Sequence, residues 1–358
     1  MCIIYVYMIV SLPSETQTLY AELLERLLAQ SARRTVGKAP GTFTTKTVHG
    51  DIYVYFQYSE PGGVCRQLYL GKRSAALDRL IARFSGERVD AARERAALER
   101  LSAQVRTGGG WTMGHRPARV LKAFADAGVF DAGAVLVGTH AFGVIGNLLG
   151  VRWESAGLRT EDVDAAAVSL AAGSEAAGAD APDALARLEM GFLPVPGLDA
   201  RRPSTSFKVR GESLRVDFLA PGRGERPVPL PRLGTNAQPL PGLEYLIENP
   251  ERAAVIDGGG FLVLVPSPAR FSLHKILVAS DRPLFQQTKA VKDLAQAAQL
   301  LGHLAEARPG DLRSASETLL ARGWSRRLSK GWHQLLRLHP GAKPLETFIS
   351  PKAGRHPA

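Results

Sequence analysis

The pattern that most limits the possible folds of this chain is a short apolar strand that turns at once into a helix. Residues 134–137 are apolar and predict a buried strand, and residues 139–149 carry apolar side chains at helical spacing. Gly138 and Thr139 form the turn between them. The first N–H groups of the helix are free there and carry partial positive charge, which favours a phosphate group. A tight turn capped by Thr139 for structural reasons has the same pattern, and both interpretations stay open.

Three aspartates lie on strands that are predicted later in the chain. Asp162 and Asp164 are two residues apart, so on a strand their side chains project to the same face. Asp217 interrupts the apolar strand at residues 214–219, where a charge is costly unless it is paired or bound to a metal ion. Carboxylate oxygens are the ligands that Mg²⁺ and Mn²⁺ prefer. The aspartates therefore predict a metal site, although an acidic pair is also typical of a solvated strand end.

Periodicity predicts an α+β chain, and its first part is residues 1–106. This part is expected to hold a helix at 14–31 and a small three-stranded antiparallel meander between residues 42 and 70. Charged helices follow at 74–106, with a break at Ser85 and Gly86.

The remaining parts differ in their periodicity. Residues 107–266 begin at a glycine-rich linker and are expected to form a mixed sheet with flanking helices, including a helix at about 179–190 and a strand at 243–247. Residues 267–350 repeat apolar side chains at helical spacing and predict a helical domain. The last residues, 351–358, are expected to be a disordered tail.

Positive charge is concentrated toward the two ends of the chain. The formal net charge is +11, and residues 320–358 hold eight Lys or Arg against one acid, whereas residues 160–200 hold eight acids against one Arg. Basic flanks around an acidic centre suit a phosphate-rich partner such as RNA or DNA, although an ordinary basic surface has the same composition. The tyrosines of the N-terminal flank would suit base stacking or the core of a small sheet. The residues predicted to contact nucleic acid are Tyr53, Tyr55, Arg66, Lys72, Arg73, Arg326, Arg327 and Lys330.

The composition also favours a cytoplasmic protein. No apolar run reaches the length of about 18 residues that a membrane-spanning helix needs. The apolar first residues lack a basic lead-in and a cleavage site, so no signal peptide is expected. Cys2 and Cys65 do not have the spacing of a disulfide framework or of a metal site.

Taken in chain order, these segments resemble the nucleotidyltransferase superfamily, which has the DNA polymerase beta-like fold. The similarity rests on Val137-Gly-Thr-His-Ala141, Thr160-Glu-Asp-Val-Asp164 and Arg215-Val-Asp-Phe-Leu219, followed by Pro268-Ala-Arg-Phe-Ser-Leu-His-Lys275 and residues 289–293. It covers roughly residues 110–330, and the chain is most similar to a group of uncharacterised bacterial proteins of this fold. Residues 107–266 would then be the catalytic domain.

The resemblance implies an enzyme that uses Mg²⁺ or Mn²⁺ to move a nucleoside monophosphate from a nucleoside triphosphate, such as ATP, to an acceptor hydroxyl. Asp162 and Asp164 would each bind both metal ions, and Asp217 would bind one of them. RNA, DNA or a protein would supply the hydroxyl, and pyrophosphate would leave. The residues implied to lie against the nucleotide are Gly138, Thr139, His140, Lys275 and Lys289.

A second class of function stays open. A non-catalytic protein that binds nucleic acid or a nucleotide would keep the same fold and the same basic flanks. The resemblance also leaves open that Lys275 and Lys289 hold the domain interface, and ordinary solvated helix faces with an ion pair between Lys289 and Asp293 have the same pattern. His140 would be a packing residue at the start of its helix. The sequence leaves the oligomeric state undetermined.

Overall fold

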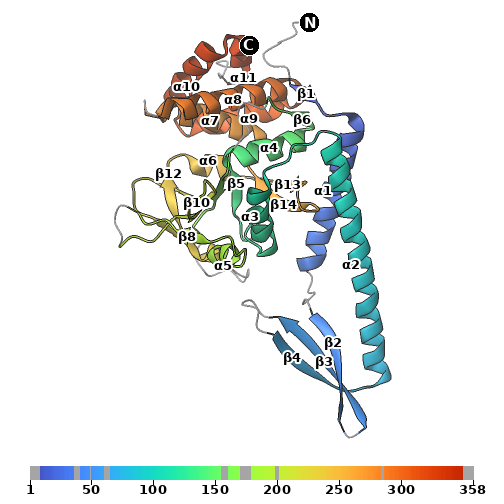
Figure 1. The fold of residues 1–358 in the computed structure, drawn as a ribbon. Helices are drawn as coiled ribbons and strands as arrows, with labels where there is room; N and C mark the ends of the chain where they lie inside the picture. The colour runs from blue at the N-terminus through green and yellow to red at the C-terminus, as the bar shows by residue number, and fades with distance from the viewer. Residues whose placement is uncertain are drawn as a thin grey trace, which may run out of the picture.

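A mixed sheet with helices packed against it forms the centre of the molecule, which confirms the predicted α+β fold class (Figure 1). The computed structural model describes residues 9–35, 41–48, 50–59, 65–154, 160–169, 179–197, 201–283 and 286–349.

The central sheet brings together strands that are far apart in the chain. Along its main path the strands are β11 (Val228–Leu230), β12 (Thr235–Leu240), β10 (Arg215–Pro221), β7 (Asp162–Ala166) and β5 (Val135–Val137). Two further strands continue from β10, namely β9 (Ser206–Val209) and β8 (Phe192–Pro194). Strand β7 is parallel to β10 and antiparallel to β5. The predicted aspartate strands are therefore neighbours.

Apolar side chains from the sheet and its helices form one continuous core. The helices beside the sheet are α3 (His115–Asp126), α4 (Gly138–Leu149), α5 (Ala181–Ala186) and α6 (Leu243–Ile247). Helix α4 is buried along most of its length, and its Phe142 ring stacks on Trp153 at a centroid distance of 4.8 Å and on Phe271 at 6.3 Å. Helix α4 therefore connects the sheet to the C-terminal helices.

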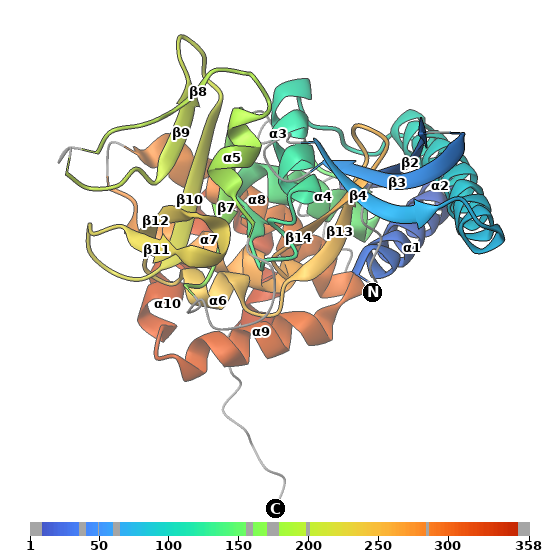
Figure 2. The same cartoon turned by 90° about the horizontal axis from the view of Figure 1, so that it is seen from below.

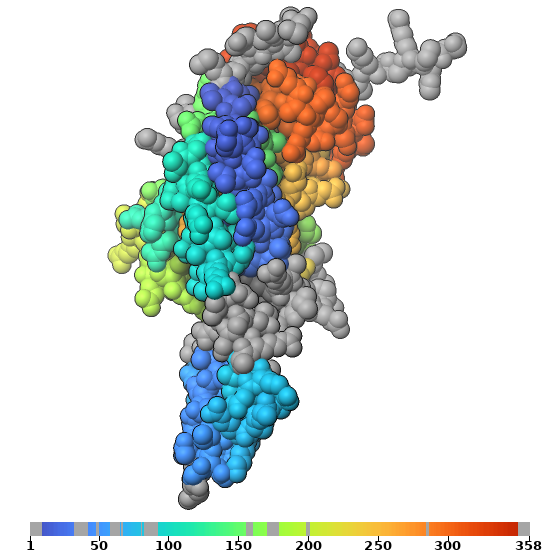
Figure 3. All heavy atoms as spheres, turned by 90° about the vertical axis from the view of Figure 1, so that its right-hand side faces the viewer, coloured from blue at the N-terminus to red at the C-terminus, as the bar shows by residue number. Residues whose placement is uncertain are grey.

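The N-terminal part is a helical hairpin that carries a small sheet. Helices α1 (Ser14–Thr35) and α2 (Ala75–Thr107) pack on each other and on the hairpin of β13 (Glu251–Val255) and β14 (Phe261–Val265). Their shared core includes the fully buried Leu23 and Val105, and the Tyr20 hydroxyl donates to Ala254 O at 3.1 Å. The small sheet consists of β2 (Gly41–Val48), β3 (Asp51–Ser59) and β4 (Cys65–Lys72). It extends away from the rest of the molecule, as Figures 1 and 3 show.

The C-terminal part is a layer of helices. It contains α7 (Pro268–Asp281), α8 (Gln287–Ala307), α9 (Pro309–Ala321), α10 (Ser325–Leu338) and the short α11 (Glu346–Ile349), with a 3-10 helix at Pro340–Leu345. Gly331 permits close approach of α10 to α7, because a Cβ at this position would collide with the backbone of Ile276. Figure 2 shows this layer and the α1–α2 hairpin at different sides of the central sheet. A two-strand contact between β1 (Val10–Ser11) and β6 (Val151–Arg152) adds to the N-terminal attachment.

Several predicted elements differ from the structure. The expected break at Ser85 and Gly86 is wrong, because α2 is one helix; a single glycine costs a helix only about 1 kcal/mol. The expected strand at 243–247 is the helix α6, in which four of five residues are buried without alternation. The helix expected at about 179–190 ends at Ala186.

The proline- and glycine-rich residues 221–242 contain β11 and β12. None of the helices in the described part of the chain is long and apolar enough to cross a bilayer.

Candidate functional site

The three predicted aspartates lie on adjacent strands at one place in the sheet. Asp164 on β7 is the direct register partner of Asp217 on β10, and Asp162 is the partner of Arg215. Side chains at paired positions of parallel strands point to the same face, and neighbouring strands are about 4.8 Å apart. Asp162, two residues from Asp164, shares that face. The fold therefore gathers residues that are more than 50 positions apart in the sequence.

The glycine turn lies against the same aspartates. Val137, the last residue of β5, is the register partner of Asp164, so the chain leaves β5 beside this carboxyl group. Gly138 has a φ of +72°, which residues with a side chain rarely adopt, and a Cβ there would also collide with the Asp164 carboxyl group. Glycine is thus required on two counts. Helix α4 begins at Gly138 without a side-chain cap, so its free N–H groups lie beside the aspartates.

Asp164 has an unusual electrostatic environment. Burial raises its pKa to about 7, and the charges of Asp217 and Asp162 add to the increase, whereas Lys275 and Lys289 oppose it. No hydrogen bond or ion pair reaches its carboxyl group from the part of the chain that the structure describes. The fold therefore holds a carboxyl group whose negative charge lacks a direct partner.

Asp217 differs because its carboxyl group is already engaged. The Arg215 Nε donates to Asp217 Oδ1 at 2.7 Å, and the Ser206 hydroxyl of β9 donates to the same oxygen. An Arg215 guanidinium nitrogen also donates to the Ser206 hydroxyl at 2.9 Å. Sequence analysis did not identify Arg215 and Ser206 as partners, because the β9–β10 pairing that brings Ser206 opposite Asp217 is a matter of register.

The three aspartates supply the carboxylate oxygens that a divalent cation requires, but the three carboxyl groups do not converge on one position. Among the described residues, no group of three or more His, Cys, Asp or Glu side chains is arranged to hold a metal ion. Asp162 is exposed, and Asp217 faces Arg215. A cation would supply the charge that Asp164 lacks, so the residues fit one at Asp162 and Asp164. Asp217 uses its Oδ1 for Arg215 and Ser206, so Oδ2 is the oxygen through which it would act as a third ligand.

The predicted lysines lie on the C-terminal helices that face the aspartates. Lys275 Nζ donates to Asp293 Oδ1 at 2.6 Å, and Arg282 Nε donates to Asp293 Oδ2 at 2.8 Å. Burial opposes the charge of Asp293, but these two cations outweigh it and lower its pKa. Among the described residues, the ion-pair partners of Asp293 are Lys275 and Arg282, and not Lys289 as in the expected pair. Lys275 thus joins α7 to α8.

A further lysine that sequence analysis did not assign lies close to the site. Lys292 is half-buried, and burial together with the charge of Lys275 lowers its pKa, whereas Asp293 and, to a smaller extent, Asp162 and Asp164 oppose this change. Lys289 is exposed three residues earlier on α8, and its charge reaches Asp164. Residues three apart share a helix face, which is the signal that could have added Lys292 to the prediction.

His140 is buried at the edge of a cleft that also contains Asp162. The cleft has a volume of about 850 Å³ and lies between residues 111–117 and the start of β7. Burial and the charge of Lys292 lower the pKa of His140 to about 4, so the ring is neutral near pH 7. Thr139, the preceding residue, is also buried.

The residues predicted to contact nucleic acid lie on two separate surfaces. Tyr53 and Tyr55 are on one face of β3 and contact Tyr69 at centroid distances of 6.2 and 5.4 Å. At the end of β4, Lys72 pairs with Asp51 at 2.6 Å, and Arg73 follows with an ion pair to Asp78 at 2.9 Å. The side chain of Arg66 lies outside the described residues.

The second surface is helix α10. Arg326 and Lys330 are exposed there, and Arg327 forms an ion pair with Asp281. Helix α10 and the β2–β3–β4 sheet are at opposite ends of the molecule (Figure 1). The structure therefore does not bring the predicted nucleic-acid residues together.

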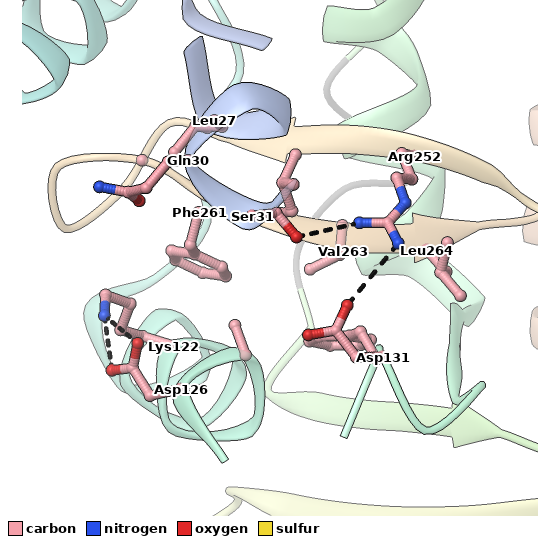
Figure 4. A pocket seen from close by; sticks show the side chains of 14 residues that line it. Leu27, Gln30, Ser31, Lys122, Asp126, Asp131, Arg252, Phe261, Val263 and Leu264 are labelled. Carbon is pink, nitrogen blue, oxygen red and sulfur yellow. Dashed lines mark hydrogen bonds and ion pairs between the residues drawn. The ribbon is translucent and has the colours of Figure 1, made fainter. Parts of the chain in front are cut away.

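A smaller cavity of about 240 Å³ lies between α1, α3 and the β13–β14 hairpin (Figure 4). Its charged side chains largely pair with one another: Lys122 with Asp126 at 2.5 Å, and Arg252 with Asp131 at 3.7 Å. It contains none of the predicted site residues, so the aspartate cluster remains the candidate site.

Comparison with known protein families agrees with this geometry. A family model described as Nucleotidyltransferase matches residues 115–321, which is more than half of the 358 residues. The matched segment contains α4, the three aspartates and the lysines of α7 and α8. Comparisons with curated proteins and with solved structures give no match. By its sequence and by the elements that carry its aspartates, the chain belongs to the nucleotidyltransferase family.

Proposed function

We propose that the protein transfers a nucleoside monophosphate from a nucleoside triphosphate to an acceptor hydroxyl, with Mg²⁺ or Mn²⁺, and releases pyrophosphate. One observation carries the proposal: in a member of this family, Asp164 and Asp217 are register partners beside the uncapped start of α4. Acids next to a phosphate-binding helix start are the pairing that nucleotidyl transfer needs.

The aspartates divide the work by their environments. Asp162 and Asp164 would hold the divalent cation, and Asp217 would join them through Oδ2, because its hydrogen bonds with Arg215 and Ser206 use Oδ1. The bound cation would neutralise charge on the phosphates. Gly138 and Thr139 would let the phosphates approach the N–H groups of α4.

The positive side of the site would hold the rest of the triphosphate. Lys289 and Lys292 lie on one face of α8, and their charges reach the aspartates. Lys275 contributes its charge while it pairs with Asp293. Lysine acts on phosphate as a point charge, so each contributes without strict geometry.

The reaction would be an in-line displacement. The acceptor oxygen forms a bond to the α-phosphorus, and the bond from that phosphorus to the bridging oxygen of the leaving pyrophosphate breaks. The hydroxyl proton passes to a carboxylate of the cluster. Positioning and charge neutralisation supply most of the acceleration in such transfers, so no protein nucleophile is required.

The acceptor would be a nucleic acid or a protein. Tyr53, Tyr55 and Tyr69 form an aromatic face on the small sheet, and the Lys46 ammonium lies 4.8 Å from the Tyr55 ring centroid. Aromatic and basic side chains on one face suit unpaired bases.

A second candidate function has a specific observation in its favour. Asp217 is tied to Arg215 and Ser206, and the described residues include no ready three-ligand metal cluster. A protein that binds a nucleotide without transferring it would retain such a pairing.

Labelling with α-³²P nucleoside triphosphates separates the two candidates. The protein is incubated with Mg²⁺ or Mn²⁺ and either total RNA or cell lysate. Nucleotidyl transfer predicts label in an acceptor, with loss of label in Asp164→Asn and Asp217→Asn but not in Asp183→Asn, a surface control on α5. Nucleotide binding with no labelled acceptor would favour the non-catalytic candidate, and equal labelling by Asp164→Asn would contradict the proposed site.

A further inference from the structure

The cleft beside Asp162 has a fixed aromatic wall that the proposed reaction does not yet use. Trp111 precedes α3 and lines the cleft together with His140. The Asn147 side chain of α4 accepts a hydrogen bond from Trp111 N at 2.7 Å and donates to Trp111 O at 2.8 Å. Both backbone polar groups of Trp111 are thus held by one buried amide.

The indole ring is also held by packing. It lies against α4 at Gly143, where a Cβ would come within 2.5 Å of the ring atoms Cδ2 and Cε2. Only a residue without a side chain permits this contact. The ring is therefore oriented before any ligand enters, which lowers the entropy cost of stacking on it.

His140 offers polar groups at the same wall. Its ring lies 6.2 Å from that of Trp111, is 1% exposed, and has no hydrogen-bond partner for either nitrogen among the described residues. The neutral ring presents one N–H donor and one nitrogen acceptor. Leaving the hydrogen bonds of both ring nitrogens unmade in a buried site costs free energy, so a ligand with complementary groups would bind more tightly.

The charges around the cleft do not suit phosphate. Arg116 pairs with Glu212 at 2.8 Å, and the Glu161 carboxylate accepts from the Ser213 hydroxyl at 2.6 Å. Asp162 adds negative charge.

The cations available for phosphate, Lys289 and Lys292, lie on α8 instead. An uncharged aromatic group with hydrogen-bonding edges fits the cleft better than a phosphate chain.

We propose that this cleft binds the base of the nucleoside triphosphate, that the base is a purine stacked on Trp111, and that His140 reads its edge. The inference rests on the proposed function. The triphosphate would lie toward α8, and His140, whose neighbour is Lys292, separates the two halves of the nucleotide. A purine covers more of an indole than a pyrimidine does, so stacking favours it. Asn147 is a positioning residue because it acts through Trp111.

Calorimetric titration with non-hydrolysable α,β-methylene analogues of ATP, GTP, CTP and UTP tests the inference on the full chain with Mg²⁺. Inorganic tripolyphosphate is the probe for the phosphate half. Wild type is expected to bind the purine analogues more tightly. Trp111→Leu keeps apolar packing on Gly143. It is expected to bind the purine analogues about tenfold more weakly than wild type and to bind tripolyphosphate with unchanged affinity. Trp111→Phe is expected to keep most of the purine preference.

The matched control is Trp324→Leu, since Trp324 lies outside the cleft and contacts Arg322 and Arg327. It should bind all probes as wild type does. Equal affinity of wild type for the four bases, or equal weakening of every probe by Trp111→Leu, would overturn the base pocket. If no nucleotide binds at all, both the pocket and the proposed function are wrong. Purine-selective binding that depends on Trp111, without any labelled acceptor, would support the pocket and contradict only the transfer reaction.

Discussion

Asp164 is half-buried and Asp293 is buried in the same region of the molecule, yet the charges around them are opposite. Asp293 receives Lys275 and Arg282 at 2.6 and 2.8 Å, and its pKa is lowered. Asp164 faces two other aspartates, receives no hydrogen bond from the described residues, and has a pKa of about 7. Removal of a buried carboxylate that has internal counter-charges leaves those charges unpaired and costs stability, whereas a carboxylate without counter-charges is a candidate for ligand binding. We propose that this contrast separates a structural acid, Asp293, from a functional one, Asp164.

The strongest way to break this comparison is to replace Asp164. Asp164→Asn is expected to lower nucleotidyl transfer by about a thousandfold or more, because a ligand for the cation is lost. The same change should leave the unfolding free energy equal or higher at pH 8, since an unpaired buried charge is removed. Rates of label transfer and thermal denaturation measure the two effects. A marked loss of stability would mean that Asp164 is structural.

The converse change is expected to act on stability. Asp293→Ala leaves Lys275 and Arg282 without their partner and should lower the unfolding free energy by about 3–5 kcal/mol. Denaturant titration checks this value. Asp183→Asn, which breaks an exposed pair with Arg187, should change stability by less than about 1 kcal/mol. Similar values for the two variants would remove the distinction between the acids.

The contact between Gly138 and Asp164 is tested by adding one methyl group. Gly138→Ala is expected to lower the unfolding free energy by about 2–3 kcal/mol, from the left-handed backbone and from the collision with the carboxyl group. Gly128→Ala is a matched control, because Gly128 has a φ of +76° and open space around it. It should cost only about 1 kcal/mol. Equal costs would mean that Asp164 can move away freely.

The lysines of α8 test the positive side of the site. Lys292→Ala is expected to raise the KM for the nucleoside triphosphate by about tenfold, because a charge near the phosphates is lost. Stability should change little, since burial already disfavours this charge. Steady-state kinetics checks the value, and Lys122→Ala on α3 serves as a control. An unchanged KM would mean that Lys292 does not face the triphosphate.

The smallest expected effect concerns His274, which is buried beside the Asp293 cluster. Burial first, and then the charge of Lys275, lower the pKa of His274 to about 3. The unfolded chain takes up a proton below pH 6.5 but the folded one does not, so stability falls as the pH drops from about 6.5 toward 3. Between pH 6.5 and 5.5, the unfolding free energy of His274→Leu should fall by about 1 kcal/mol less than that of wild type. Parallel acid titrations of the two proteins would contradict this.

Much of the central sheet could be predicted from the sequence. A period of two residues puts Asp162 and Asp164 on one face, and an apolar strand with an internal aspartate indicates that Asp217 has a special role. The strand-to-helix turn at Gly138 is also visible in the sequence, because glycine and a change of period coincide there. These features are local, and local patterns determine them.

Features that depend on register or on distant packing could not be predicted. The pairing of Asp164 with Asp217 and the hydrogen bonds of Asp217 depend on how strands align. Asp293 pairs with Lys275 on another helix and not with Lys289 on its own helix, and tertiary packing determines this partner. Helix α6 is buried on nearly every side, so its sequence lacks the alternation of apolar and polar residues at helical spacing that would have indicated a helix. The clamp of Asn147 on Trp111 joins residues 36 positions apart without any motif.

The long helix α2 has a consequence for the size of an acceptor. Its 33 residues correspond to a length of about 50 Å, with the small tyrosine-bearing sheet at one end. At the other end the chain reaches Trp111 within a few residues, and Trp111 lines the same cleft as Asp162. An acceptor that touches both ends of this rod must be a long polymer or a large protein, and a short one can engage only one end at a time. Under the proposed function, the molecule would distinguish acceptors by reach as well as by chemistry.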